Sequence, residues 1–237
     1  MQVHIVHYAE GAARARGLAV VIDVFRAFSA ACYAFHRGAR RIIATHSLDI
    51  ARQIKKQNPH YLLMGERHAQ KPSDFDFGNS PSELAEADLS GATLVHTTHA
   101  GTRALLAANQ AEEAITGSFV NAAAIARYIR NLSPASVYLV CSGFEGQKEA
   151  AEDLLCAQYI RDLLLEREPD YSRIADKLQT APSAVRFFDP ADPASPESDF
   201  YLCLHLDCFP TVLRRTHTNT DYCLLEPVTL NPPSPTD

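Results

Sequence analysis

The chain has 237 residues, of which 46% are hydrophobic, and carries a formal net charge of −6. This length and composition suffice for a folded core without a disulfide or a structural metal, and the acidic balance argues against nucleic acid as a partner. The N-terminus has no signal-peptide pattern and no segment reaches the length of a membrane span, so we expect a cytoplasmic protein without membrane contact. The six cysteines form no C-x-x-C pair and are expected to be reduced.

Short β-branched segments alternate with amphipathic segments of helical length from Leu18 to about Ile160, a pattern typical of α/β proteins. Strands are expected at residues 18–23, 41–45, 61–64, 93–96, 113–116 and 136–140, and helices at 28–37, 48–57, 82–87, 102–108, 122–131 and 150–166. Ser47 and Ser80 are expected to cap two of these helices. We predict a three-layer α/β/α fold with a mixed, mostly parallel sheet, to which residues 2–8 and 222–227 add strands at an edge.

The pattern changes after Glu166 to shorter helical pieces, expected at 171–178, 181–187 and 196–206. We therefore divide the chain into an α/β catalytic core (1–166) and a helical C-terminal extension (167–230) that packs on the core and contributes the second edge strand. The proline-rich segment 231–237 is predicted to be a disordered tail.

The most informative segment is V-V-I-D-V-F-R-A-F-S at 20–29, where a buried apolar run ends in Asp23 and Arg26. Residues beyond the carboxyl end of a strand in an α/β sheet face the crevice where ligands bind. There the planar guanidinium of Arg26 suits an anion, and Asp23 suits a divalent cation. Glu66 follows the strand expected at 61–64 in the same way, so both carboxylates can converge on one ion, although a solvated surface turn also explains Glu66.

Three later segments also place polar residues after strands. Thr97, Thr98, Gly101 and Thr102 suit either an anion at a helix start or plain helix capping, and capping alone is favoured. Gly117-Ser118 leads to Asn121, which is a cap or a ligand-facing amide. The segment after Cys141 leads to Asp153 in the first turn of a helix, where it either complements the helix dipole in solvent or points back at a site. A Walker loop is absent, and Gln147 stands where a cysteine phosphatase needs arginine.

Five strand ends with polar residues in one domain are better explained by a shared site than by five separate causes. In their order, the motifs resemble the 2-phosphosulfolactate phosphatase family of coenzyme M biosynthesis. The resemblance covers about 18–160 and rests on V-I-D-V-F-R-A-F-S, M-G-E-R, F-D-F-G-N-S-P-S-E, T-T-H-A-G-T, G-S-F-V-N-A and A-E-D-L-L-C-A, with a weaker echo at 198–207. The matching positions are Asp23, Arg26, Glu66, Arg67, Asp76, Gly78, Asn79, Ser80, Thr97, Thr98, Gly101, Thr102, Asn121, Glu152 and Asp153.

The resemblance implies a Mg²⁺-dependent phosphomonoesterase that hydrolyses (2R)-2-phospho-3-sulfolactate, a small doubly anionic substrate, to 3-sulfolactate and phosphate. Our hypothesis assigns Asp23, Arg26, Glu66 and Asp153 to catalysis, with Asp23, Glu66 and Asp153 gathering one Mg²⁺ directly or through water. Substrate binding is assigned to Arg67, Asn79, Ser80, Thr97, Thr98, Gly101, Thr102 and Asn121. Attack by metal-activated water is preferred over an aspartyl-phosphate at Asp23, but the sequence leaves both open.

Some positions depart from the family pattern. Ala100 stands where asparagine is familiar, Phe28 where a smaller residue is common, and His96 and His99 flank the threonine pair. These departures bear on substrate identity more than on reaction type. The alternatives are therefore a phosphatase for another small 2-phospho acid and a non-catalytic binder of phosphorylated or sulfonated anions. The frequency of two-fold assemblies among soluble proteins suggests a homodimer.

Overall fold

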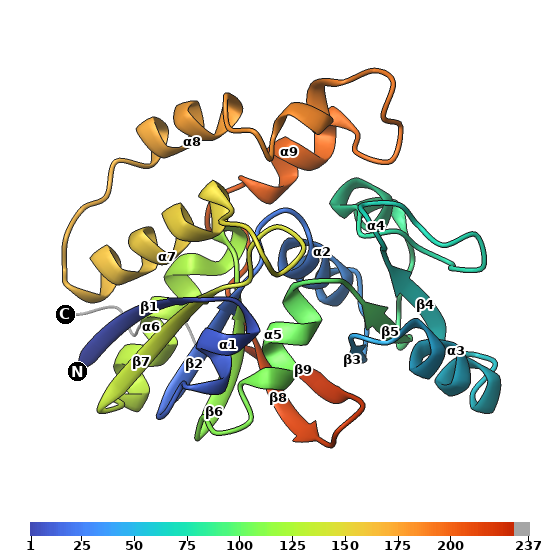
Figure 1. Ribbon diagram of the computed structural model, residues 1–237, viewed down its shortest axis with the longest axis horizontal. Helices are drawn as coiled ribbons and strands as arrows, with labels where there is room; N and C mark the ends of the chain where they lie inside the picture. Colours follow the sequence, from blue (N-terminus) through green and yellow to red (C-terminus); the bar gives the residue numbers. More distant parts are fainter. Residues whose placement is uncertain (230–237) are drawn as a thin grey trace.

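The structure, a computed structural model, describes residues 1–229 and contains one mixed sheet with helices on both faces (Figure 1). The strands are β1 (Gln2–His7), β2 (Leu18–Ile22), β3 (Arg41–Thr45), β4 (Leu62–Gly65), β5 (Thr93–Thr97), β6 (Glu113–Gly117), β7 (Ser136–Cys141), β8 (Thr211–Thr218) and β9 (Cys223–Thr229). Their order in the sheet is β1-β7-β2-β6-β8-β9-β3-β5-β4. The predicted α/β class with a mixed, mostly parallel sheet is confirmed.

The helices fill both outer layers, as predicted. They are α1 (Tyr8–Ala13), α2 (Ala27–His36), α3 (Leu48–Gln57), α4 (Pro81–Glu86), α5 (Gly101–Ala107), α6 (Ala122–Leu132), α7 (Ala151–Leu164), α8 (Tyr171–Gln179) and α9 (Glu197–Cys203), with short 3₁₀ turns η1 (Phe119–Asn121) and η2 (Val185–Phe188). Ser47 and Ser80 accept hydrogen bonds from the amides of Ile50 and Glu83, so both predicted caps are present. Helix α1 and the 3₁₀ geometry of η2 were not predicted.

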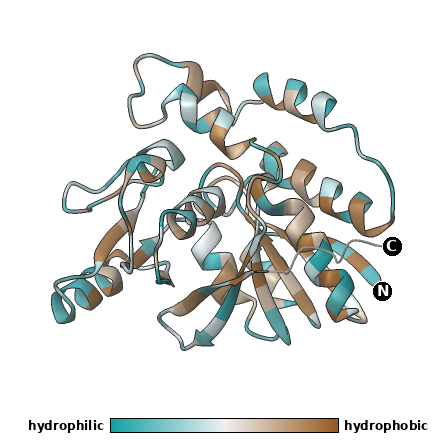
Figure 2. Cartoon of the chain, turned by 180° about the vertical axis from the view of Figure 1, so that it is seen from behind, coloured by the Kyte–Doolittle hydropathy of each residue, from teal (hydrophilic) through white to brown (hydrophobic). Residues whose placement is uncertain are grey.

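The central strand β2 shows how the core is divided. Successive side chains of a strand point to opposite faces, and all five residues of β2 are buried. Leu18, Val20 and Ile22 pack with α6 and α7 on one face, whereas Ala19 and Val21 pack with α1, α2 and α5 on the other. Figure 2 shows brown and teal alternating along the covering helices, as expected for helices whose apolar residues pack against a sheet. Burial on both faces explains why β2 reads as a continuous apolar run.

The position predicted for the C-terminal strand is wrong. Residues 222–227 were placed at an edge, but β9 lies in the middle of the sheet, paired with β3 on one side and with the unpredicted β8 on the other (Figure 1). The β8–β9 hairpin joins two parallel groups, β1-β7-β2-β6 and β3-β5-β4, through antiparallel pairings. Strand β1 does form an edge, as predicted. The segment 231–237, predicted to be disordered, lies outside the described residues.

Within residues 1–229, no helix combines the length and the apolar character that a membrane crossing requires.

Candidate active site

A cavity of about 340 Å³ lies where the loops after β2, β4, β5 and β7 meet. Four of the five strand ends predicted to share a crevice therefore do so, and the exception is the loop after β6. The charged side chains that line the cavity are Asp23, Glu66, Glu145, Glu152 and Asp153 on the acidic side, and Arg26 and Arg186 on the basic side. Asn79, His68 and His99 complete its polar lining.

Asp23 is fixed where β2 passes into α2. Its Oδ1 accepts a hydrogen bond from the amide of Ala27, the first residue of α2, at 3.1 Å. Only 8% of Asp23 is exposed. Burial raises the pKa of Asp23 from its ordinary 3.8 to about 6, and the negative charges of Glu66 and Glu152 contribute to the rise. Neighbouring carboxylates that raise one another's pKa form a site where a cation is favourable.

Asp153 comes from the first turn of α7 but faces the cavity, not solvent. Its Oδ1 accepts from the amide of Val24 at 2.9 Å, and its Oδ2 accepts from the amide of Gly143 at 2.9 Å and the hydroxyl of Ser142 at 3.2 Å. Burial raises its pKa well above the ordinary value, and the charges of Asp23 and Glu152 raise it further. Asp153 therefore ties the loops after β2 and β7 together beside Asp23.

Glu66 joins the loops after β4 and β5. Its Oε2 accepts from the amide of Ala69 at 2.8 Å, and its Oε1 accepts from the amide of His99 at 3.0 Å. Glu152, which matched a motif but was given no role, is buried and accepts from the hydroxyl of Ser183 at 2.5 Å. Burial raises the pKa of Glu152. With Glu145, the acidic part of the cavity thus contains two more carboxylates than predicted.

The donor chemistry of this cluster suits Mg²⁺, which prefers oxygen ligands. Within residues 1–229, however, no three His, Cys, Asp or Glu side chains stand in an arrangement that could hold a metal alone. Asp23, Glu66 and Asp153 share the cavity but are not a preformed set of three direct ligands. Mg²⁺ usually keeps several waters and uses one or two carboxylates together with substrate phosphate, and the cluster fits that mode.

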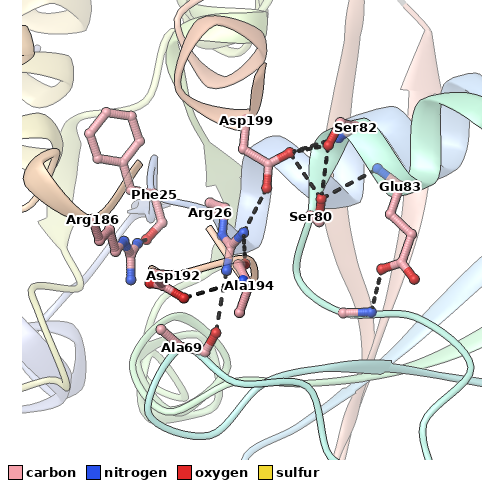
Figure 3. A network of polar contacts seen from close by, with 11 residues as sticks. Phe25, Arg26, Ala69, Ser80, Ser82, Glu83, Arg186, Asp192, Ala194 and Asp199 are labelled. Atoms are coloured by element: carbon pink, nitrogen blue, oxygen red, sulfur yellow. Dashed lines mark hydrogen bonds and ion pairs between the residues drawn. The ribbon is translucent and has the colours of Figure 1, made fainter. Parts of the chain in front are cut away.

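Arg26 lines the cavity and forms an ion pair with the buried carboxylate of Asp199, which does not line it. Its Nη1 lies 2.6 Å from Oδ2 of Asp199 in α9 and donates to the carbonyl of Ala194 at 2.8 Å. The other oxygen of Asp199 accepts from the hydroxyls of Ser80 and Ser82 and from the Ser82 amide, at 2.7 to 2.9 Å (Figure 3). Asp199 was not predicted as a site residue, and only the weak motif echo at 198–207 pointed to it.

Several predicted substrate-binding residues do not line the cavity. Arg67 donates to Oγ1 of Thr97 at 2.7 Å and to the carbonyls of His46 and Glu66. These bonds fix the loop after β4 to the ends of β3 and β5. Thr98 and Thr102 bond to each other at the start of α5, where the Thr102 amide donates to Oγ1 of Thr98 at 3.1 Å. These contacts correspond to helix capping, the alternative to anion binding that the sequence favoured for these threonines. The polar groups of these residues bond within the protein and none of them lines the cavity, so their assignment to substrate binding stays a prediction.

Asn121 does not line the cavity either. Its Oδ1 accepts from the Ser118 amide at 3.2 Å, and its Nδ2 donates to the carbonyl of Thr211 in β8 at 3.1 Å. Asn79 does line the cavity, and its Oδ1 lies 3.1 Å from Nε2 of the buried His96. Burial lowers the pKa of His96 to about 3, so its ring is neutral at physiological pH. Ser80 lies in an adjoining cavity shared with Arg26 and Asn79.

Gly101 acts by leaving space for Asp23. A Cβ atom at this position would lie 2.6 Å from Oδ2 of Asp23. We expect Gly101→Ala to displace the Asp23 carboxylate and lower kcat/KM for the phosphatase reaction that the sequence resemblance implies at least about 10-fold, because a misplacement of about 1 Å in an active site is costly. Gly91→Ala is the matched control, since nothing lies within 4 Å of a Cβ there. Because Gly91 has a φ of 72°, alanine is strained there, and we expect this control to lose some stability but to keep its activity. Equal activity of the two variants would contradict this role.

The raised pKa values predict how stability depends on pH without metal. The pKa of Asp23 is about 6 in the folded protein against an ordinary 3.8. Between about pH 4 and pH 6 the folded state therefore holds more protons than the unfolded state, and the free energy of unfolding falls as pH rises through this window. Asp23 alone contributes on the order of 3 kcal/mol to this fall. Urea unfolding in EDTA should show a smaller fall for Asp23→Asn than for wild type; identical pH profiles would contradict the assignment.

The fold and the cavity define an α/β protein with a charged cavity in which carboxylates from strand ends and a helix start share the lining with two arginines. Comparison with known sequences gives the particular family. Residues 3–217 match the 2-phosphosulpholactate phosphatase family, and the chain belongs to it. The match extends the resemblance at 18–160 through α9 and into β8.

Individual relatives agree with the family match. A protein of Caldicellulosiruptor saccharolyticus named "Probable 2-phosphosulfolactate phosphatase" is 40% identical over 156 residues, 64% of each chain. A protein of the same name from Thermotoga petrophila is 37% identical over 159 residues, 67% of this chain and 68% of its own. A third, from Bacillus subtilis, is 30% identical over 187 residues, 78% of this chain and 80% of its own. The chain thus covers just under two-thirds of the first of these relatives.

Proposed function

We propose that this protein is a Mg²⁺-dependent phosphatase that hydrolyses (2R)-2-phospho-3-sulfolactate to 3-sulfolactate and phosphate. The observation that carries the proposal is the single cavity in which buried, mutually repelling carboxylates face Arg26 and Arg186. In such a cavity a divalent cation offsets the charge of the carboxylates, and the phosphoryl and sulfonate groups of the substrate can bind the cation and the arginines. Family membership and the names of the relatives point to the same substrate.

Asp23, with Glu66 and Asp153 directly or through water, would hold the Mg²⁺. When bound, the ion supplies positive charge that offsets the charge developing on the phosphoryl oxygens. The chain supplies the positioning: three donors fix Asp153, two backbone amides fix Glu66, and the Ala27 amide fixes Asp23. Groups fixed before substrate arrives need little reorganisation during reaction, which is the main source of catalysis in phosphoryl transfer.

A substrate panel tests this function. Phosphate release should be measured with Mg²⁺ on (2R)-2-phospho-3-sulfolactate, on 2-phospholactate, which lacks the sulfonate, and on a simple aryl phosphate. We expect kcat/KM to be highest for the sulfonated substrate. Equal or faster release from 2-phospholactate would favour a phosphatase for another 2-phospho acid. A ligand-induced rise in Tm with no release from any compound would favour the non-catalytic binder.

A further inference from the structure

Arg186 is a half-buried cation that forms no ion pair within the described residues. It is supplied by η2, in the C-terminal part of the chain, and it lines the cavity beside Asp23 and Glu152. Its Nη2 donates to the carbonyl of Phe25 at 3.0 Å. Within the described part of the chain, its buried Nε has no acceptor, and no carboxylate oxygen lies within 4.0 Å of its guanidinium nitrogens. A partly desolvated charge and a buried N–H without an acceptor are both unfavourable, so the arrangement favours an outside anion.

Arg26 provides the contrast. Both arginines line the same cavity, and Figure 3 shows them as neighbours. The charge of Arg26 is offset at 2.6 Å by Asp199, and its Nη1 also serves the carbonyl of Ala194. Arg186 has only the Phe25 carbonyl, and burial together with the charge of Arg26 lowers its pKa. An arginine side chain stays protonated in proteins. Of the two arginines, Arg186 is therefore the one without an ion pair and with N–H donors that have no acceptor in the described part of the protein.

The position of Arg186 is fixed before a ligand arrives. Its guanidinium carbon lies 4.9 Å from the centre of the Phe187 ring, a cation–π distance. Phe187 in turn packs edge-on against Phe25, with ring centres 5.0 Å apart, and Phe25 is the residue whose carbonyl Arg186 bonds. The aromatic contact therefore docks η2 on the loop after β2 and directs the guanidinium into the cavity.

We propose that Arg186 is a substrate-binding residue that grips an anionic oxygen group of the ligand, phosphoryl or sulfonate, with the nitrogens that the protein leaves unused. Arginine suits this task because its planar fork of donors matches the oxygens of such groups. The ligand class rests on the proposed function, but the presence of an anion subsite at Arg186 does not. The C-terminal segment thereby completes the site that the strand ends begin.

The test compares Arg186→Gln and Arg186→Lys with Arg173→Gln, a control on the exposed arginine of α8 in the same segment. With Mg²⁺ and (2R)-2-phospho-3-sulfolactate, we expect Arg186→Gln to raise KM at least about 10-fold, Arg186→Lys to recover part of the loss, and the control to match wild type. A rise in KM for the sulfonated substrate alone assigns Arg186 to the sulfonate. A loss of kcat/KM that extends to 2-phospholactate and to the simple aryl phosphate, which has no carboxylate, assigns it to the phosphoryl group. Unchanged constants on both substrates in the folded Gln variant would overturn the proposal.

Calorimetric titration separates this proposal from the proposed function, because it needs no turnover. The probes are inorganic phosphate and 3-sulfolactate, each with Mg²⁺. If wild type releases no phosphate from its substrate but binds either probe at least 10-fold more tightly than Arg186→Gln, the proposed function fails and the Arg186 subsite stands. If wild type turns over substrate while both proteins bind the probes equally, the subsite fails and the function stands. If wild type neither turns over substrate nor binds a probe, both fail.

Discussion

Asp23→Asn is expected to lower kcat for phosphate release about 1,000-fold while the protein stays folded, because it removes the carboxylate that we propose would hold the cation beside the phosphoryl group. The amide keeps the shape of the side chain and its bond from Ala27. It also removes a buried carboxylate whose pKa is raised by burial and by its acidic neighbours. The measurement is the steady-state rate with saturating Mg²⁺ and (2R)-2-phospho-3-sulfolactate.

The matched control is Asp49→Asn, at an exposed aspartate in the first turn of α3. This variant should keep wild-type activity. Thermal unfolding in EDTA at pH 7.5 checks folding, and Asp23→Asn should be at least as stable as wild type there. Wild-type turnover by folded Asp23→Asn would remove Asp23 from the site. Loss of activity with a lower Tm would instead mean that Asp23 is structural.

Asp199→Leu has the largest expected effect on stability. It leaves the Arg26 guanidinium buried without its partner, and it removes the acceptor for Ser80 and Ser82. Breaking a buried ion pair from one side typically costs about 3–5 kcal/mol. In a domain of this size, that corresponds to a Tm about 10 °C lower. Urea unfolding in EDTA measures the change without a contribution from bound metal or ligand.

A double-mutant cycle shows whether the cost comes from the pair itself. In Arg26→Met/Asp199→Leu neither charge remains buried, so the double variant should be more stable than the sum of the two single losses predicts, by at least about 1 kcal/mol. Strictly additive losses would mean that Asp199 acts through the serines and not through Arg26. The surface pair of Arg52 and Asp74, 2.8 Å apart with both side chains 45% exposed, is the control cycle and should couple by less than about 1 kcal/mol.

The parts of the site that the sequence predicted share a local signal. Asp23 and Glu66 directly follow strands, and Asp153 lies in the first turn of the helix after β7, so their place at one end of the sheet follows from topology. The threonines were harder to interpret. A hydroxyl after a strand and before a helix can face a ligand or cap the helix, and the sequence T-T-x-x-G-T is the same for both. In this fold Thr98 and Thr102 satisfy each other.

The missed features depend on contacts between distant parts of the chain. Strand β8 carries polar residues along much of its length, and its pairing with β6 joins segments nearly a hundred residues apart. Arg186 and Asp199 lie in short elements whose local sequence is unremarkable. The packing of Phe187 and Phe200 against Phe25 brings Arg186 to the cavity and Asp199 to Arg26. Such placement is a property of tertiary packing, which periodicity and capping do not encode.

The central claim is that the carboxylate and arginine cavity hydrolyses a phosphosulfonate with a bound divalent cation. The most direct test is phosphate release from (2R)-2-phospho-3-sulfolactate by wild-type protein treated with EDTA, before and after excess Mg²⁺ is restored. We predict no release above background in EDTA and recovery of the full rate with Mg²⁺. Undiminished release in EDTA, or no release after Mg²⁺ is restored to protein that is still folded, would contradict the claim.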